Sequence, residues 1–238
     1  MITLDNIGKS FGGEWAVRRL SIAINDGEVF GLLGPNAAGK TTTIKMMTGL
    51  LRPTEGRILI RGYDIVKEPI KAKSIIGYVP DRAFFYEKLT GREFLLFIAS
   101  IHGLGKIEAL SRIEELINTF GIKDIENELI ESYSQGMRQR LLFASSMVHN
   151  PEVFIIDEPF VSIDPSGMRR LKGVIKDLSS VGTTIFLATH SLHIAEELCN
   201  RVGVINKGYL IALKNRDEIT SIEGGLEGLF DELLYLTP

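Results

Sequence analysis

The chain has 238 residues, of which 45% are hydrophobic and 24% are charged, and its formal net charge is −3. These values describe a globular protein with enough residues for one full core, and they exclude a disordered or fibrous chain. The acidic balance argues against a dedicated nucleic-acid binder, so no nucleic acid is expected as a partner. The one cysteine, Cys199, permits no internal disulfide and favours a reducing compartment.

Two features bear on membranes. The N-terminal sequence MITLDNIGKS has no basic start followed by an apolar run, so we expect no signal peptide. The longest apolar run, Phe94–Ile101, is far shorter than a bilayer span. If the protein works at a membrane, we expect another chain to provide the span.

Several strands are expected in the first eighty residues, outside the glycine-rich loop and the helix described below. Residues Ile2–Ile7 and Leu20–Ile24 alternate apolar and polar side chains, which predicts antiparallel strands. Between them we expect a loop over Lys9–Trp15 that turns at its two glycines. Two further strands, Gly56–Ile60 and Ile75–Val79, are expected on either side of a polar stretch.

The most informative motif is GPNAAGKTT at Gly34–Thr42, which fits G-x-x-x-x-G-K-[ST]. It follows the apolar run Glu28–Leu33 and precedes a helical pattern over Thr42–Leu51. Backbone N–H groups of such a loop can cradle phosphate oxygens at a helix start. Lys40 would supply a positive charge for the outer phosphates, and the Thr41 hydroxyl could ligate Mg²⁺. The alternative is a glycine-rich turn that only starts a helix.

After Pro80 the pattern becomes helical as far as about residue 149. Thr90 can cap a helix that runs from Gly91, and no strand pattern appears in this stretch. Just before it stand three successive aromatic residues, Phe84, Phe85 and Tyr86. We expect them to dock a membrane partner. The alternative is that they fill the seam between the two lobes, the α/β core and the helical insertion.

From Val153 the α/β pattern resumes. The buried-strand run Val153–Ile156 is followed by Asp157 and Glu158, and the strand Thr184–Ala188 by His190. A helix is expected from Pro165 to Ser180. A final antiparallel pair is expected near Val202–Ile205 and Tyr209–Leu213.

Two carboxylates that end a buried strand lie where open α/β sheets bind ligands. Asp157 would hold the Mg²⁺ shell, and Glu158 could orient or deprotonate an attacking water. His190 could contact a γ-phosphate from the end of its strand, although a lone histidine is more often structural. Acidic residues that merely cap the next helix are the alternative for the pair.

The stretch SYSQGMRQR at Ser132–Arg140 is a second potential phosphate site. Ser134 can cap the helix that follows, and Gly136 leaves its first turn unobstructed. An ordinary capped helix remains the alternative.

With these motifs in order, the chain resembles the ATP-binding subunit of ABC transporters over essentially its whole length. Gly34–Thr42 is similar to the Walker A loop, Ile155–Glu158 to Walker B with its catalytic glutamate, and Tyr133–Met137 to a variant of the signature LSGGQ. Ser162–Asp164 is similar to the D-loop, His190 to the switch histidine and Phe11 to the aromatic that stacks on adenine. The resemblance implies that ATP contacts Phe11, Gly34, Pro35, Asn36, Ala37, Ala38, Gly39, Lys40, Thr41, Thr42, Ser134, Gln135, Gly136 and Asp164, that Thr41, Asp157 and Asp81 lie near Mg²⁺, and that Glu158, His190 and Lys40 serve catalysis.

The sequence departs from the family pattern at several positions. Ala37 replaces the usual third loop glycine, and we expect the loop to tolerate its β-carbon. Gln135 and Met137 replace the Gly and Gln of the signature. Asp81 stands where most relatives carry the Q-loop glutamine, so a shorter, charged acceptor replaces a neutral donor and acceptor.

The resemblance implies an α/β fold: a P-loop NTPase core with a mostly parallel sheet, an N-terminal antiparallel β subdomain and an inserted all-helical subdomain. We expect the core to comprise 1–81 and 151–238, and the helical subdomain 82–150. The implied function is an ATPase at the cytoplasmic face of the cell membrane. It would bind Mg-ATP in a head-to-tail homodimer or close-homologue heterodimer and power transport through a separately encoded transmembrane subunit. Export is favoured, because the YS-x-GM pattern at Tyr133–Met137 is similar to that of export-type subunits. The alternatives are an ABC-type ATPase acting on ribosomes or DNA, and a P-loop small-molecule kinase.

Overall fold

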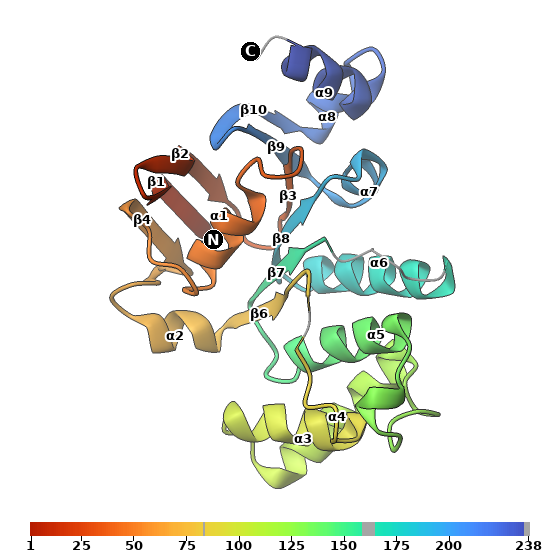
Figure 1. Cartoon of the computed structure of the whole chain (residues 1–238). Helices are drawn as coiled ribbons and strands as arrows, with labels where there is room; N and C mark the ends of the chain where they lie inside the picture. Colours follow the sequence, from red (N-terminus) through yellow and green to blue (C-terminus); the bar gives the residue numbers. More distant parts are fainter. Residues whose placement is uncertain (83, 159–164, 236–238) are drawn as a thin grey trace.

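The computed structural model of the chain describes residues 1–82, 84–158 and 165–235 (Figure 1). The expected D-loop, with Asp164, lies outside these residues. Within them the chain forms two sheets and a set of helices that cover them. Helices α3–α5 lie at the opposite end of the molecule from the C-terminal helices α8 and α9.

The smaller sheet is N-terminal and antiparallel. Its strand order is β2 (Glu14–Ile24), β1 (Ile2–Phe11), β4 (Glu55–Ile60) and β5 (Tyr63–Asp64). The alternating pattern of β1 and β2 buries one face, as the sequence predicts for antiparallel strands.

The prediction of a loop over Lys9–Trp15 was wrong. The two strands continue to Phe11 and from Glu14, which face each other in register. Only Gly12 and Gly13 turn the chain, with φ of 58° and 93°. A two-residue hairpin turn of type I′ needs positive φ at both central positions, and a glycine pair adopts it at low cost. The hairpin therefore extends further than the side-chain alternation indicates.

The larger sheet has the order β10 (Tyr209–Asn215), β9 (Arg201–Asn206), β3 (Val29–Leu33), β8 (Thr184–Thr189), β7 (Val153–Asp157) and β6 (Ile76–Val79). Strands β6, β7, β8, β3 and β9 are parallel, and β10 runs antiparallel to β9. The carboxyl ends of β3, β7 and β8 therefore meet at one edge, where open sheets of this kind bind ligands. This mostly parallel sheet beside an antiparallel one confirms the predicted α/β fold class.

The helices of the described residues fall between and after these strands. They are α1 (Lys40–Met47), α2 (Pro69–Ser74), α3 (Gly91–Ile101), α4 (Lys106–Phe120), α5 (Gln135–Ser146), α6 (Pro165–Ser180), α7 (Leu192–Leu198), α8 (Arg216–Thr220) and α9 (Gly225–Tyr235), with a 3₁₀ turn at Ile130–Ser132. Between β6 and β7 the described elements are all helical, and Thr90 caps α3 as expected. The domain boundaries at 81/82 and 150/151 stay a prediction.

Two hydrophobic cores hold these layers together. One lies between the two sheets and encloses α1, with Phe30, Leu32 and Ile44 fully buried. The other joins the opposite face of the larger sheet to α3–α7, through residues such as Phe154 and Phe143. Because both cores meet on β3, β7 and β8, the ligand-binding edge of the sheet rests on rigid, packed strands. Among the described helices, none is long and apolar enough to cross a membrane.

Candidate functional site

The loop between β3 and α1 is held in a tight shape by two glycines. A Cβ at Gly34 would lie 2.3 Å from the Ile205 carbonyl oxygen, which no side chain tolerates. Gly39 has φ of 114°, and a Cβ there would lie 2.7 Å from the Ala16 carbonyl oxygen. Both positions therefore require glycine, as the motif predicts, and they aim the start of α1 at the carboxyl edge of the sheet.

Ala37, in the same loop, adopts φ of 63°, in the left-handed region. The loop keeps its shape with a β-carbon at this position. Left-handed backbone costs a non-glycine residue roughly 1–2 kcal/mol, so the alanine holds local strain. Strain of this kind is found where a surrounding structure fixes a functional loop.

Lys40 points back into its own loop. Its side chain is buried, and Nζ donates hydrogen bonds to the carbonyl oxygens of Gly34 at 2.7 Å and Pro35 at 3.1 Å. The same nitrogen lies 3.7 Å from Glu158 Oε1. The ammonium is thus held at the mouth of the loop by groups that an incoming anion can replace.

Asp157 ends β7 and is almost completely buried. Neither of its carboxylate oxygens has a hydrogen-bond partner among the described residues. Burial, the largest influence, raises the pKa of Asp157 to about 6, and the charges of Asp81 and Glu158 act in the same direction, whereas the Thr41 hydroxyl and Lys40 lower it. An unpaired buried carboxylate beside a hydroxyl and a second carboxylate is a donor set that suits a hard divalent cation.

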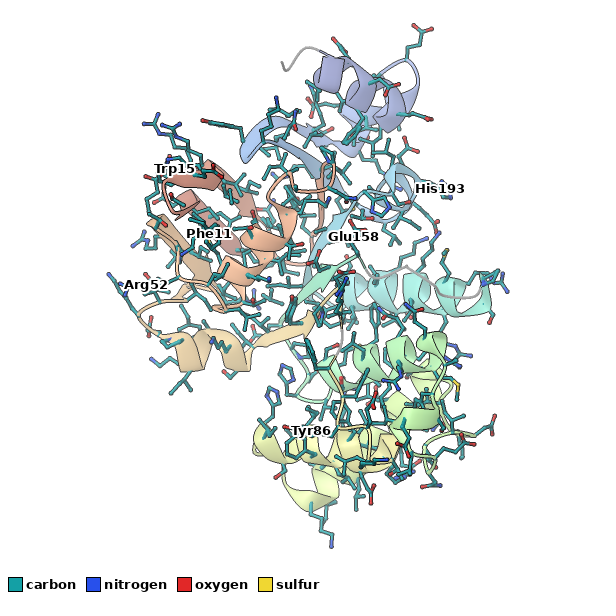
Figure 2. All side chains as sticks on the ribbon, viewed as in Figure 1. Phe11, Trp15, Arg52, Tyr86, Glu158 and His193 are labelled. Atoms are coloured by element: carbon teal, nitrogen blue, oxygen red, sulfur yellow. The ribbon has the colours of Figure 1, made fainter. Side chains whose placement is uncertain are left out.

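Glu158 follows in an unusual conformation, with φ of 48°. Its backbone N–H bonds the Ala188 carbonyl at 3.0 Å, which ties it to the end of β8. Glu158 Oε2 accepts a hydrogen bond from the Thr189 hydroxyl at 3.3 Å and lies 2.9 Å from His190 Nδ1. The carboxylate is therefore oriented by residues of the next strand, and Figure 2 shows it near the centre of the molecule.

These groups surround one cavity of about 460 Å³. Most of the predicted phosphate-loop residues line it, together with Asp81, Glu158 and His190. Gly34 and Pro35 do not line it but accept hydrogen bonds from Lys40, which does. The buried Asp157 precedes Glu158, another lining residue. The lining residues are Ala16, Asn36, Ala37, Ala38, Gly39, Lys40, Thr41, Thr42, Asp81, Glu158 and His190.

Sequence reasoning missed two members of this site. Ala16 lines the cavity from β2, and its carbonyl oxygen lies close to Gly39. Thr189 holds Glu158. No motif marks Ala16, because it contributes backbone and lies between the predicted loop, which ended at Trp15, and the predicted strand, which began at Leu20. Thr189 could have been found, since it precedes His190 at the carboxyl end of a core strand.

Phe11 does not line this cavity. It ends β1 next to the Gly12–Gly13 turn, is half exposed, and has the Lys9 ammonium 5.3 Å from its ring centroid. Figure 2 shows it on the N-terminal sheet. Trp15, across the hairpin, stacks with the Arg18 guanidinium at 5.7 Å instead. An exposed ring at this corner remains available for stacking.

The second predicted phosphate site, at the start of α5, is also separate from the cavity. Ser134 caps α5 by accepting a hydrogen bond from the Met137 N–H at 3.3 Å, as expected. Ser134 and Gln135 are exposed, and a Cβ at Gly136 would meet nothing within 4 Å. This helix start is thus open to its surroundings.

The three aromatic residues before α3 differ in exposure. Phe84 is 92% exposed and Tyr86 is 61% exposed. Phe85 instead packs against the helical core, edge-on to Phe94 at 5.2 Å. Phe84 and Tyr86 are thus exposed and Phe85 is packed, and docking of a membrane partner at this segment stays a prediction.

Comparison with known proteins decides the family. The family described as ABC transporter matches residues 17–161. The chain belongs to this family. The ABC protein described here is 38% identical over 237 residues to the linearmycin resistance ATP-binding protein LnrL of Bacillus subtilis, covering 100% of this chain and 75% of that protein.

Solved structures agree. The ATP-binding subunit of an ABC transporter superimposes with a TM-score of 0.92 at 28% identity, covering 98% of this chain and 99% of that one. An ATP-binding cassette solved as a dimer with ADP and phosphate has a TM-score of 0.83 at 22% identity, covering 91% and 99%, which shows the fold alone. The recognition of an ABC ATP-binding subunit from sequence is confirmed. This ABC protein is an ATPase, and a P-loop small-molecule kinase has no support.

Proposed function

We propose that this ABC ATPase binds Mg-ATP between two chains arranged head to tail, and that it powers export through a separately encoded transmembrane subunit. One observation carries the proposal. The chain holds two helix starts suited to phosphate, at α1 and α5, and the second does not line the cavity of the first. An open, capped helix start with a bare glycine is suited to close over a phosphate held by another copy.

In the proposed complex, residues 34–42 cradle the phosphates and Lys40 contacts the outer ones. The two carbonyl oxygens that now accept from Lys40 would be exchanged for phosphate oxygens, which carry full charge and make stronger hydrogen bonds. Phe11 would stack on the adenine. Ser134, Gln135 and Gly136 of the other chain, with Asp164, would complete the site.

We assign Mg²⁺ to Thr41, Asp157 and Asp81. The fit rests on the two unpartnered oxygens of Asp157 and on its burial, since a charge in that position needs compensation. Bound there, the cation would neutralise charge on the phosphates during hydrolysis. Asp81, which lines the cavity, would supply a carboxylate where relatives supply a glutamine.

Glu158 is the proposed base for the attacking water. Its carboxylate is within reach of the cavity and is held from two sides, by Thr189 and by His190. A fixed carboxylate orients the water and accepts its proton with little rearrangement. His190, largely exposed toward the cavity, would contact the γ-phosphate once it is bound.

Export and the location at the cytoplasmic face of the membrane rest on two supports. LnrL, named for linearmycin resistance, is a relative of high coverage. Phe84 and Tyr86 are exposed aromatic side chains of the kind that protein partners bind. A homodimer and a close-homologue heterodimer both fit the proposed arrangement.

The dimer is tested with Glu158→Gln, which keeps the shape of the side chain and removes the base. With Mg-ATP this variant should elute from size exclusion as a dimer, because ATP is bound and not consumed. Adding Gly136→Asp to the same variant is the matched control and should leave a monomer, since a carboxylate would face the γ-phosphate of the other chain. A Glu158→Gln variant that stays monomeric at saturating Mg-ATP would overturn the proposal.

A further inference from the structure

The segment that carries the exposed aromatic side chains is hydrogen-bonded to the lead-in of α5. The Glu131 N–H donates to the Glu87 carbonyl at 3.1 Å, and the Ile130 N–H donates to the Leu89 carbonyl at 2.9 Å. Residues 87–89 and 129–131 therefore lie side by side, although they are some forty positions apart in sequence. Tyr86, immediately before this pairing, is labelled beside α3 and α4 in Figure 2.

Arg138, in the first turns of α5, joins the two ends of this arrangement. Its Nη1 lies 2.9 Å from Glu87 Oε1, and its Nε donates to the Tyr133 carbonyl at 3.3 Å. Its backbone N–H also donates to the Ser134 carbonyl at 2.9 Å. One guanidinium thus contacts the aromatic segment and the residue that precedes the Ser134 cap.

We propose that Glu87 is a positioning residue: through Arg138 it fixes the orientation of Tyr133 and Ser134, so that the segment with Phe84 and Tyr86 and the start of α5 move as one unit. The inference rests on the proposed function, in which Ser134 and Gly136 close over the ATP of a second chain. A guanidinium suits this role because its planar fork makes directed hydrogen bonds to a carboxylate and a carbonyl at once.

The pair is poorly placed to serve stability. The side chains of Arg138 and Glu87 are 29% and 55% exposed. Exposed ion pairs contribute little to folding because water screens them and two long side chains must be ordered. The pair instead fixes the geometry of the backbone just before Ser134. Displacing this backbone would move Ser134, which caps α5.

The chain offers a matched control in the same place. Lys88 and Glu131 form an ion pair at 2.5 Å that joins the same two segments, with side chains that are also exposed. If the segments needed only any ion pair between them, losing Lys88–Glu131 and losing Glu87–Arg138 would have the same effect. The proposal requires that only loss of the Glu87–Arg138 pair affects the closing of the dimer.

The experiment measures ATP-dependent dimerisation in the Glu158→Gln background and steady-state hydrolysis in the otherwise native chain. Glu87→Gln should raise the ATP concentration for half-maximal dimerisation, and KM, about three- to tenfold, the size expected for one ordinary hydrogen bond, since solvent weakens this partly exposed pair. The value of kcat should stay within about twofold, because the signature contact is lost equally from ground and transition states. The melting temperature should not change measurably.

Two further variants decide whether Glu87 acts through Arg138. The double variant Glu87→Gln, Arg138→Gln should be no worse than Arg138→Gln alone, since the two side chains form one interaction. Lys88→Met should match the native chain in every readout. The inference is overturned if Glu87→Gln leaves KM and dimerisation unchanged, if the two changes add, or if Lys88→Met has the same effect. Dimerisation of the Glu158→Gln parent separates these outcomes from failure of the proposed function. If the proposed function were wrong, the parent itself would not dimerise with ATP.

Discussion

The two helix starts that the proposal brings together are built in opposite ways. At α1 the loop is packed against its own chain, so that a Cβ on Gly34 or Gly39 would collide with a backbone carbonyl. At α5 the glycine faces open space, and Ser134 is exposed. The glycines of the first site are required by the fold, whereas Gly136 has no such requirement. Packing within the chain therefore accounts for Gly34 and Gly39 but not for Gly136, which fits the proposal that a second chain docks there.

The largest expected effect concerns chemistry at the buried site. Glu158→Gln should lower kcat by about 10²–10⁴, the usual contribution of a positioned general base. The ATP concentration needed for binding should change little, because the phosphates are held by residues 34–42. Steady-state phosphate release and nucleotide binding on the same preparation measure both. A variant that keeps more than a tenth of native turnover would remove Glu158 from the role of base.

The second prediction tests the contrast between the glycines directly. Gly39→Ala should destabilise the chain by more than about 2 kcal/mol, through strained backbone and the clash with the Ala16 carbonyl. Gly136→Ala should leave the isolated chain equally stable, or up to about 1 kcal/mol more stable, because alanine favours helix. It should nevertheless weaken ATP-dependent dimerisation. Urea denaturation and size exclusion of the two variants are the measurements. Equal destabilisation by both changes would contradict the contrast.

The third prediction uses the pKa of Asp157, which burial raises to about 6 from an unfolded value of 3.8. The protonated carboxyl therefore stabilises the nucleotide-free fold below about pH 4, and this contribution is lost as the pH rises through about 6. Between pH 7.5 and pH 5 this group alone should add about 1 kcal/mol of stability.

Asp157→Asn removes that pH dependence. The variant should be about 3 kcal/mol more stable than the native chain at pH 7.5 in metal-free, nucleotide-free buffer, while losing hydrolysis. Melting curves at both pH values measure the difference, and Asp124→Asn, at an exposed position, should behave as the native chain does. If Asp157→Asn melts no higher at pH 7.5, the carboxylate is compensated in the free protein and the argument for a cation there weakens.

The smallest effect is expected at Ala37, on the strained side of the contrast. Ala37→Gly should change the free energy of unfolding by less than about 1 kcal/mol, since relief of the left-handed strain is offset by the greater entropy of glycine in the unfolded chain. Ala37→Val should cost more, because a β-branched side chain is least compatible with positive φ. Equilibrium denaturation of the pair gives the sign. A Val variant as stable as the Gly variant would show that the loop relaxes.

Much of the fold could be predicted from the sequence because local signals agree with the tertiary structure. The Gly34–Thr42 loop, the Thr90 and Ser134 caps and the strand before Asp157 each have a residue pattern with one physical meaning. The short elements β5, α2 and α8 were missed, since each has too few residues for a period to be recognised. The full length of the β1–β2 hairpin was missed because its pairing past Ile7 shifts register repeatedly.

The candidate site was predictable in its residues and less so in its geometry. The motifs mark Lys40, Asp157 and Glu158, but the left-handed backbone at Ala37 and Glu158 depends on surrounding packing that no short motif encodes. Ala16 contributes backbone atoms to the site, and backbone atoms leave no pattern in the sequence. The distance between the cavity and the start of α5 is likewise a property of the whole fold.

Whether each ATP is shared by two chains can be tested by mixing two inactive variants. Lys40→Ala removes the phosphate-loop charge and Gly136→Asp blocks the start of α5, so each variant alone should be almost inactive. In a mixed dimer one site combines an intact Lys40 from one chain with an intact Gly136 from the other. Mixing should therefore restore a substantial part of native ATPase activity, because each mixed dimer has one intact site. Activity in the mixture that remains the sum of the two inactive parents would contradict it.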